Sequence, residues 1–199
     1  MNKSKFVALF VALLGLAAAA PAAAQMSLYF GGSIGNTEAH QDACQDAQFG
    51  CDRSDTSYAG HLGFMFSPNW GIEVTGRNMG KIVERNFGDG TAAEWKSKAV
   101  DAVIVGALPF SQIGLGDRFA IYGKAGGYYA RTNVESSSPQ VASAERTNRQ
   151  WTYGVGVSYD VFKWFRLRAE WQRYNNVGAS DVGMRADVNV ISGGAVIVF

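Results

Sequence analysis

The sequence feature that most constrains this chain is an alternation of apolar and polar residues with a period of two. It recurs in segments of about ten residues, separated by polar stretches. A period of two places successive side chains on opposite faces of a β-strand. Eight such segments predict eight strands: Ser27 to Asn36, Thr56 to Phe66, Gly71 to Met79, Trp95 to Phe110, Arg118 to Arg131, Gln150 to Val161, Phe165 to Tyr174 and Asp187 to Phe199.

One face of each segment is apolar, and the other face is polar or small. In the third segment, Ile72 and Val74 share one face, whereas Glu73, Thr75 and Arg77 share the other. A soluble barrel would show the reverse pattern, and an outward Arg or Lys near the middle of a membrane costs about 2–4 kcal/mol. We therefore predict that the apolar face contacts lipid and that the charged side chains point into the interior.

The segments are separated by alternately short and long connections. Only helices and closed barrels satisfy every backbone polar group in lipid, and no stretch of about 18 apolar residues follows the first 24. The predicted fold class is therefore all-β: an eight-stranded antiparallel transmembrane β-barrel with an up-and-down meander.

Short turns are expected on the periplasmic side and long loops outside the cell. The short turns are 67–70, 111–117 and 161–164, and the long loops are 37–55, 80–94, 132–149 and 175–186.

Aromatic residues gather toward both ends of the predicted strands, as in the girdles of membrane barrels. We expect them to mark the two membrane interfaces. Toward the short turns lie Phe30, Phe66, Trp70, Phe110, Phe119, Phe162, Trp164, Phe165 and Phe199; toward the long loops lie Tyr58, Trp95, Tyr129, Trp151, Tyr153 and Trp171.

The first 24 residues have the pattern of an export signal. Lys3 and Lys5 precede an apolar run, and Ala22 to Ala24 provide a small-residue cleavage site. We expect residues 1–24 to be a cleaved signal peptide and residues 25–199 to form the barrel domain. Without Lys3 and Lys5, the chain has 16 basic and 17 acidic residues. This nearly neutral charge does not indicate a nucleic-acid partner.

Two segments carry a resemblance to a known family. They are Leu167-Arg168-Ala169-Glu170-Trp171-Gln172-Arg173-Tyr174-Asn175-Asn176-Val177-Gly178 and Tyr122-Gly123-Lys124-Ala125-Gly126-Gly127-Tyr128. With the eight segments and the terminal Phe199, the chain resembles the OmpA-type outer-membrane barrels over residues 25–199. The resemblance implies that the assembly machinery reads the last strand at Phe199. Nothing corresponds to the peptidoglycan-binding domain of the longest members, so no cell-wall tether is expected.

The predicted interior holds seven charged residues. An eight-stranded barrel is only wide enough for its own side chains, so opposite charges there should pair. The resemblance implies that Glu73, Lys124, Arg168 and Glu170 belong to an interior ion-pair network. The network would act as a structural plug, or alternatively as a narrow gate for ions. The full set is Glu73, Arg77, Asp101, Lys124, Arg166, Arg168 and Glu170.

Both cysteines, Cys44 and Cys51, fall in the first long loop. A disulfide is expected between them because the compartment is oxidising. A metal site that adds His40, Asp42 and Asp52 is the alternative, but the spacing fits no zinc pattern well.

Catalysis is not predicted. The chain has two histidines, His40 and His61, and neither is followed closely by a serine that would suggest a nucleophilic dyad. His61 is expected to be a hydrogen-bonded residue of the interior. We expect no cofactor and no catalytic or metal-binding residue.

The sequence therefore predicts a protein of the Gram-negative outer membrane with a mainly structural role in envelope integrity. Adhesion or surface recognition through the first and third long loops is one alternative, and a small low-conductance pore is another. A secreted soluble ligand-binding barrel would need an apolar interior. Expected partners are outer-membrane lipid and lipopolysaccharide, the barrel-assembly machinery and periplasmic chaperones during biogenesis, and a host or surface ligand at the loops; we expect a monomer.

Overall fold

The computed structural model describes residues 26–40, 51–86, 91–114, 116–137, 144–179 and 184–199. Most of these residues are in β-strands, and within these ranges no helix has the length and hydropathy needed to cross a membrane. One short 3-10 helix, η3 (Phe110–Ile113), lies in a turn. The strands are β1 (Ser27–Ala39), β2 (Cys51–Asp52), β3 (Ser54–Met65), β4 (Trp70–Asn86), β5 (Ala92–Pro109), β6 (Phe119–Ser136), β7 (Ala144–Phe162), β8 (Phe165–Ala179) and β9 (Met184–Val198).

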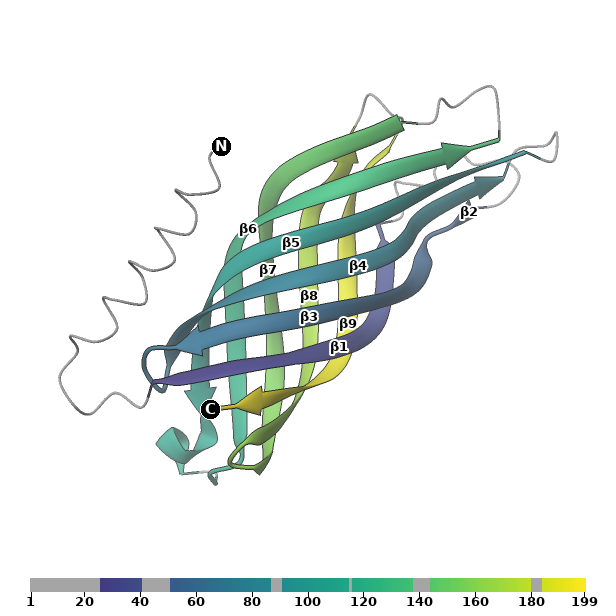
Figure 1. The fold of residues 1–199 in the computed structure, drawn as a ribbon. Coiled ribbons are helices and arrows are strands. Elements are labelled where there is room, and N and C mark those ends of the chain that lie inside the picture. Colours follow the sequence, from purple (N-terminus) through teal and green to yellow (C-terminus); the bar gives the residue numbers. More distant parts are fainter. Residues whose placement is uncertain (1–25, 41–50, 87–90, 115, 138–143, 180–183) are drawn as a thin grey trace.

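The eight long strands close into an antiparallel barrel (Figure 1). Their order is β4-β3-β1-β9-β8-β7-β6-β5, and β5 pairs with β4 to complete the ring. The first and last long strands meet, with Gly31 opposite Val196. The short β2 adds one pairing at the far end of β4. This arrangement confirms the predicted eight-stranded meander.

The strands run well past their predicted ends at the long connections. β4 continues to Asn86 and β5 begins at Ala92, so most of the loop predicted at residues 80–94 is paired strand. The loops predicted at 132–149 and 175–186 are shortened in the same way. These boundaries were wrong because the added segments carry polar residues outward. In β4, two register shifts between Asn78 and Val83 also break the alternation.

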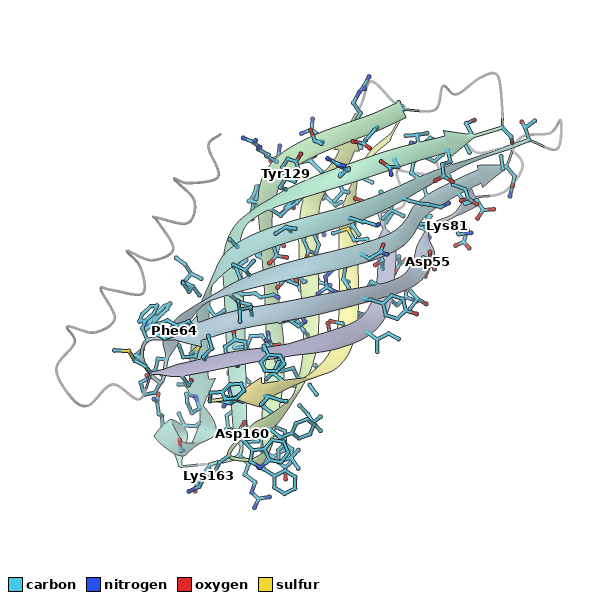
Figure 2. The ribbon with its side chains drawn as sticks, in the orientation of Figure 1. Asp55, Phe64, Lys81, Tyr129, Asp160 and Lys163 are labelled. Atoms are coloured by element: carbon cyan, nitrogen blue, oxygen red, sulfur yellow. The ribbon has the colours of Figure 1, made fainter. Side chains whose placement is uncertain are left out.

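The outer surface of the barrel is an apolar belt. Its larger side chains are about half exposed in the isolated chain, as the lipid-facing prediction requires, and include Phe30, Ile34, Leu62, Ile72, Val74, Val100, Ile104, Val155, Val157 and Ile191. In β9, Val188, Val190 and Val196 point inward and are buried. Figure 2 places Asp55 and Lys81 at the long-connection end and Asp160 and Lys163 at the short-turn end.

The interior is divided into two layers, which the sequence did not predict. A charged layer lies nearer the short turns, and an apolar core occupies the end beneath the long connections. The apolar core contains Met79, Ile82, Val83, Trp95, Tyr128, Val134, Tyr174, Val177, Val188 and Val190. Trp95 is 2% exposed, so its place in the outer girdle was wrong. Its neighbours Lys96 and Glu94 take the outward positions because side chains alternate along β5.

Candidate functional site: the charged interior

Four charged side chains form the centre of the interior, which we call the charge cluster: Glu73 on β4, Lys124 on β6, and Arg168 and Glu170 on β8. Lys124 Nζ lies 2.7 Å from Glu170 Oε1 and 3.3 Å from Glu73 Oε1. Arg168 spans the same two carboxylates, with Nη1 2.5 Å from Glu73 Oε2 and Nη2 3.0 Å from Glu170 Oε2. Each cation therefore contacts both carboxylates, as buried charges require.

Two tyrosines donate hydrogen bonds to the charge cluster. The Tyr29 hydroxyl donates to Glu73 Oε2 at 2.7 Å, and the Tyr122 hydroxyl donates to Glu170 Oε2 at 3.0 Å. Arg168 donates to the Tyr122 hydroxyl from Nε at 3.0 Å, and its guanidinium carbon lies 4.7 Å from the centre of the Tyr122 ring. Tyr29 was missed in the sequence, although its place between the outward Leu28 and Phe30 gives its direction.

Asp101 and Arg77 lie where the charged layer meets the apolar core. Asp101 Oδ2 accepts hydrogen bonds from the Tyr174 hydroxyl at 2.6 Å and from Gln172 Nε2 at 3.3 Å. Arg77 Nε donates to the same Tyr174 hydroxyl at 3.2 Å, and its Nη2 lies 3.7 Å from Glu170 Oε1. The fully buried Tyr174 thus joins both groups to the apolar core.

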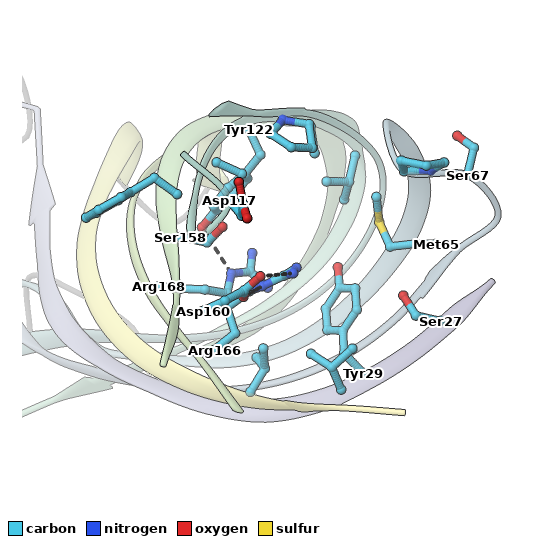
Figure 3. Close-up of a pocket in the computed structure, with 18 residues that line it drawn as sticks. Ser27, Tyr29, Met65, Ser67, Asp117, Tyr122, Ser158, Asp160, Arg166 and Arg168 are labelled. Carbon is cyan, nitrogen blue, oxygen red and sulfur yellow. Dashed lines mark hydrogen bonds and ion pairs between the residues drawn. The ribbon is translucent and has the colours of Figure 1, made fainter. Parts of the chain in front are cut away.

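Arg166, another predicted network residue, lies apart from the charge cluster near the short turns. It forms a two-point ion pair with Asp160, which is also near the short turns. Both residues line a cavity of about 300 Å³ at that end of the barrel, whose wall also includes Arg168 and Tyr29 (Figure 3). The cavity leads from the short-turn end to the charge cluster.

His61 is buried beside the charge cluster. Its Nε2 lies 2.9 Å from Ser33 Oγ, and its Nδ1 lies 3.2 Å from Thr75 Oγ1 and 3.6 Å from Glu73 Oε1. All of these neighbours are hydrogen-bonded interior groups. Among the described residues, no group of three or more His, Cys, Asp and Glu side chains is placed to hold a metal.

The predicted disulfide involves a residue outside the described ranges. Cys51 begins β2 opposite Arg85, and the described chain has no free cysteine. Cys44 and Asp42 lie outside the described residues, so the pairing stays a prediction. Asp52 accepts a hydrogen bond from the backbone of Ser54 at 3.1 Å.

Outside the apolar belt, the extended ends of β4, β5 and β6 carry a charged surface, which we call the outer platform. Lys96 Nζ lies 2.9 Å from Glu94 Oε2 and 2.8 Å from Glu135 Oε2. Lys81 Nζ lies 2.5 Å from Glu84 Oε2. The hydrogen bond from Lys96 lowers the pKa of Glu94, and hydrogen bonds to Glu135 and Glu94 raise the pKa of Lys96. These pairs are largely solvated and contribute little stability each.

Comparison with known proteins identifies relatives of the same architecture. A family model described as outer membrane protein beta-barrel domain matches residues 7–199. Outer membrane protein A of Salmonella typhi is 24% identical over 196 residues, which cover 96% of this chain and 54% of that protein. The chain thus spans about half the length of this curated relative.

Two solved structures show the same fold. Neisserial surface protein A has a TM-score of 0.56 at 13% identity, and the match covers 86% of this chain and 97% of that one. The attachment invasion locus protein Ail of Yersinia pestis, solved with the heparin analogue sucrose octasulfate, has a TM-score of 0.52 at 15% identity. That match covers 87% of this chain and 97% of Ail. At these identities the likeness concerns the fold alone.

Proposed function

Because the chain belongs to the family of outer membrane protein β-barrel domains, we propose that it is a structural element of the outer membrane whose interior is closed. The observation that carries the proposal is the layered interior. The paired charge cluster lies below an apolar core that includes Trp95, Tyr174 and Met79. Ions cross an apolar layer poorly because each loses its hydration there. The charge cluster then serves as a plug that holds the strands together.

The same proposal includes the processing and biogenesis of the protein. Residues 1–24 would be removed as a signal peptide, and residues 25–199 would enter the membrane as a monomer with the short turns in the periplasm. Lipopolysaccharide would surround the barrel outside, and periplasmic chaperones and the assembly machinery would deliver it. No catalytic role is proposed, because the polar groups around His61 are engaged with one another.

The test is the leakiness of a deletion strain to detergent. The strain would be complemented with the full protein or with a barrel whose four long connections are cut to tight turns. Rescue by the cut barrel is expected if the barrel carries the function. Rescue by the full protein alone would transfer the function to the connections. No leak in the deletion strain would contradict an integrity role.

Current recordings in planar bilayers separate the plug from the small pore. The intact protein is expected to give no resolved channel steps. Steps whose size changes on substitution of Lys124 or Glu170 would overturn the plug.

Surface recognition is a second candidate, supported by the outer platform. Strands β4 to β6 extend past the apolar belt and present Lys81, Lys96 and Glu135 away from the barrel axis. A paired sheet holds such groups in fixed positions, as recognition requires. Serine substitution of Cys44 and Cys51 should weaken adhesion to host cells if the first connection takes part, while the barrel still folds.

A further inference from the structure

A groove of about 940 Å³ crosses the apolar outer surface near the short turns. A row of four paired residues on β4 to β7 forms its floor and two ends: Trp70 is opposite Gly106, Gly106 is opposite Gly123, and Gly123 is opposite Val155. Leu108, Ile121 and Val157 form a second apolar row beside it. The Trp70 ring lies over Gly106, where an added methyl group would meet it at 3.1 Å, so the hollow lies above Gly123.

The internal packing of the barrel does not explain glycine at position 123. Its φ is not in the left-handed region. A methyl group added there would meet only the Gly154 carbonyl oxygen, at 3.9 Å, which is ordinary contact. Glycine weakens a strand interior and often marks a site where a ligand or another backbone approaches closely. Other outward glycines such as Gly76 are equally open, but Gly123 also lines the groove between Trp70 and Val155.

The groove is polar at one end only. At the short turns, Asn69 and Gln112 form a reciprocal amide pair, with Nδ2 to Oε1 at 2.9 Å and Nε2 to Oδ1 at 3.0 Å. Asn69 Nδ2 also donates to the Ala107 carbonyl at 2.9 Å. The second N–H of Gln112 and the remaining lone pairs of both amides are available to a ligand. The remaining walls are apolar and half exposed, among them Trp70, Leu108, Ile121 and Val155.

The geometry points to a phospholipid of the periplasmic leaflet, with one acyl chain in the groove and its polar head at the Asn69–Gln112 pair. The groove lies within the belt that lipid contacts, and its polar end lies at the periplasmic turns. Inside a membrane, apolar contacts gain no hydrophobic driving force, so retention depends on close packing. A hollow with walls on two sides gives a chain more contacts than the flat belt elsewhere.

Native mass spectrometry of the protein, extracted from membranes in mild detergent, tests the site. The intact barrel is expected to retain one phospholipid that survives gentle activation. Gly123→Val fills the hollow with a residue that suits a strand, so the retained lipid should be lost. Gly76→Val is the matched control, because Gly76 also faces outward and an added methyl group meets nothing within 4 Å. The control should keep its lipid.

Gln112→Leu tests the polar end, since it removes one amide and leaves the apolar walls intact. Retention of phosphatidylethanolamine added to delipidated protein should fall for this variant. The shift in gel mobility between folded and heated barrel confirms that each variant is folded.

Equal retention by the intact barrel and Gly123→Val, or equal loss in Gly76→Val, would overturn the site. A dimer in light scattering that Gly123→Val dissociates would replace the lipid with a second copy of the chain. These outcomes do not depend on the integrity role.

Discussion

At the scale of single residues, the buried charges are held by one another rather than by solvent. Lys124 is fully buried and contacts both Glu73 and Glu170. Its removal would leave two carboxylates with only Arg168 and Arg77 near them. Apolar replacement of one partner in such a group is costly, although replacement of the whole group need not be.

Lys124→Met is expected to destabilise the barrel by about 3–5 kcal/mol, because it removes one of the two cations that contact both buried carboxylates and leaves their negative charge incompletely paired. Urea titration of the barrel in lipid vesicles measures the change. Lys96→Met on the outer platform is the control and should cost about 1 kcal/mol or less, since its ion pairs are solvated. Equal midpoints for the two variants would contradict the central role of the charge cluster.

Trp95 is one of the largest side chains buried in the apolar core beneath the long connections. It is 2% exposed, whereas Trp151 faces outward at 56%. Trp95→Ala should cost about 3–5 kcal/mol because it opens a cavity in the apolar core. Trp151→Ala should cost less, since lipid fills the vacated space. The same urea titration compares them, and a larger loss for Trp151→Ala would disprove the assignment of Trp95 to the core.

At the scale of elements, β4 changes direction at a bulge outside the apolar belt. Gly80 has a φ of +66°, and the side chain of Asp55 lies against it. Asp55 Oδ2 accepts a hydrogen bond from the Lys81 backbone at 2.7 Å, which ties β4 to β3 where their ladder ends. The bulge sets the direction in which the outer platform extends.

Gly80→Ala should cost about 1–2 kcal/mol or more, because φ is unfavourable for a side chain and an added methyl group would lie 2.5 Å from Asp55 Oδ2. Hydrogen exchange of the amides from Asn78 to Val83 should accelerate. Gly76→Ala, on the same strand with open space around it, should change neither quantity. Unchanged hydrogen-exchange protection in Gly80→Ala would show that the bulge accommodates a side chain without strain.

The outer platform should respond to pH at both extremes. Glu94 has a lowered pKa in the folded chain, so its stabilising effect is present above the ordinary value of 4.5 and is lost as the pH falls through the folded value. Lys96 has a raised pKa, so its contribution is present below 10.5 and is lost at higher pH. The hydrogen-exchange protection of the amides of residues 92–98 should therefore fall at both pH extremes. The fall should be smaller in high salt, which screens the ion pairs. A response that salt does not reduce would exclude these ion pairs as its cause.

At the scale of the whole molecule, the barrel closes through its last residue. The Phe199 backbone N–H donates to the Leu28 carbonyl at 2.8 Å, and the Leu28 N–H donates back at 3.3 Å. The Phe199 ring stacks on Phe30, with centroids 5.8 Å apart. The C-terminus thus lies beside the start of β1 at the short-turn end (Figure 1).

Phe199→Ala should reduce the amount of assembled barrel in cells more than it reduces stability in vesicles. The aromatic pair itself is worth about 0.5–1.5 kcal/mol beyond its buried area, and the backbone pairing remains. Heat-modifiable migration of the membrane fraction measures assembly, and urea titration measures stability. Normal assembly in cells would contradict a role for Phe199 as the signal that the machinery reads.

The fold was largely predictable because every strand of the belt obeys one constraint. Lipid excludes charge from the outer face, so Ile72, Val74 and their equivalents show in the sequence which face of each strand points outward. The directions of Glu73, Lys124, Arg168 and Glu170 followed from the same alternation. Their proximity could not follow from it, because the pairing register decides which rows meet. Arg166 shows this limit: its direction was right, but its partner is Asp160 at the rim.

The sequence by itself determined the strand number, the meander and the two faces of the belt, since these depend on side-chain period and on the cost of charge in lipid. Only the tertiary structure decided how far the strands continue, because outside the lipid no such cost marks their faces. It also decided that Trp95 and Tyr174 fill the interior beneath the long connections and that Gly106 and Gly123 lie side by side. Both results depend on the register between strands, which brings together residues far apart in the chain.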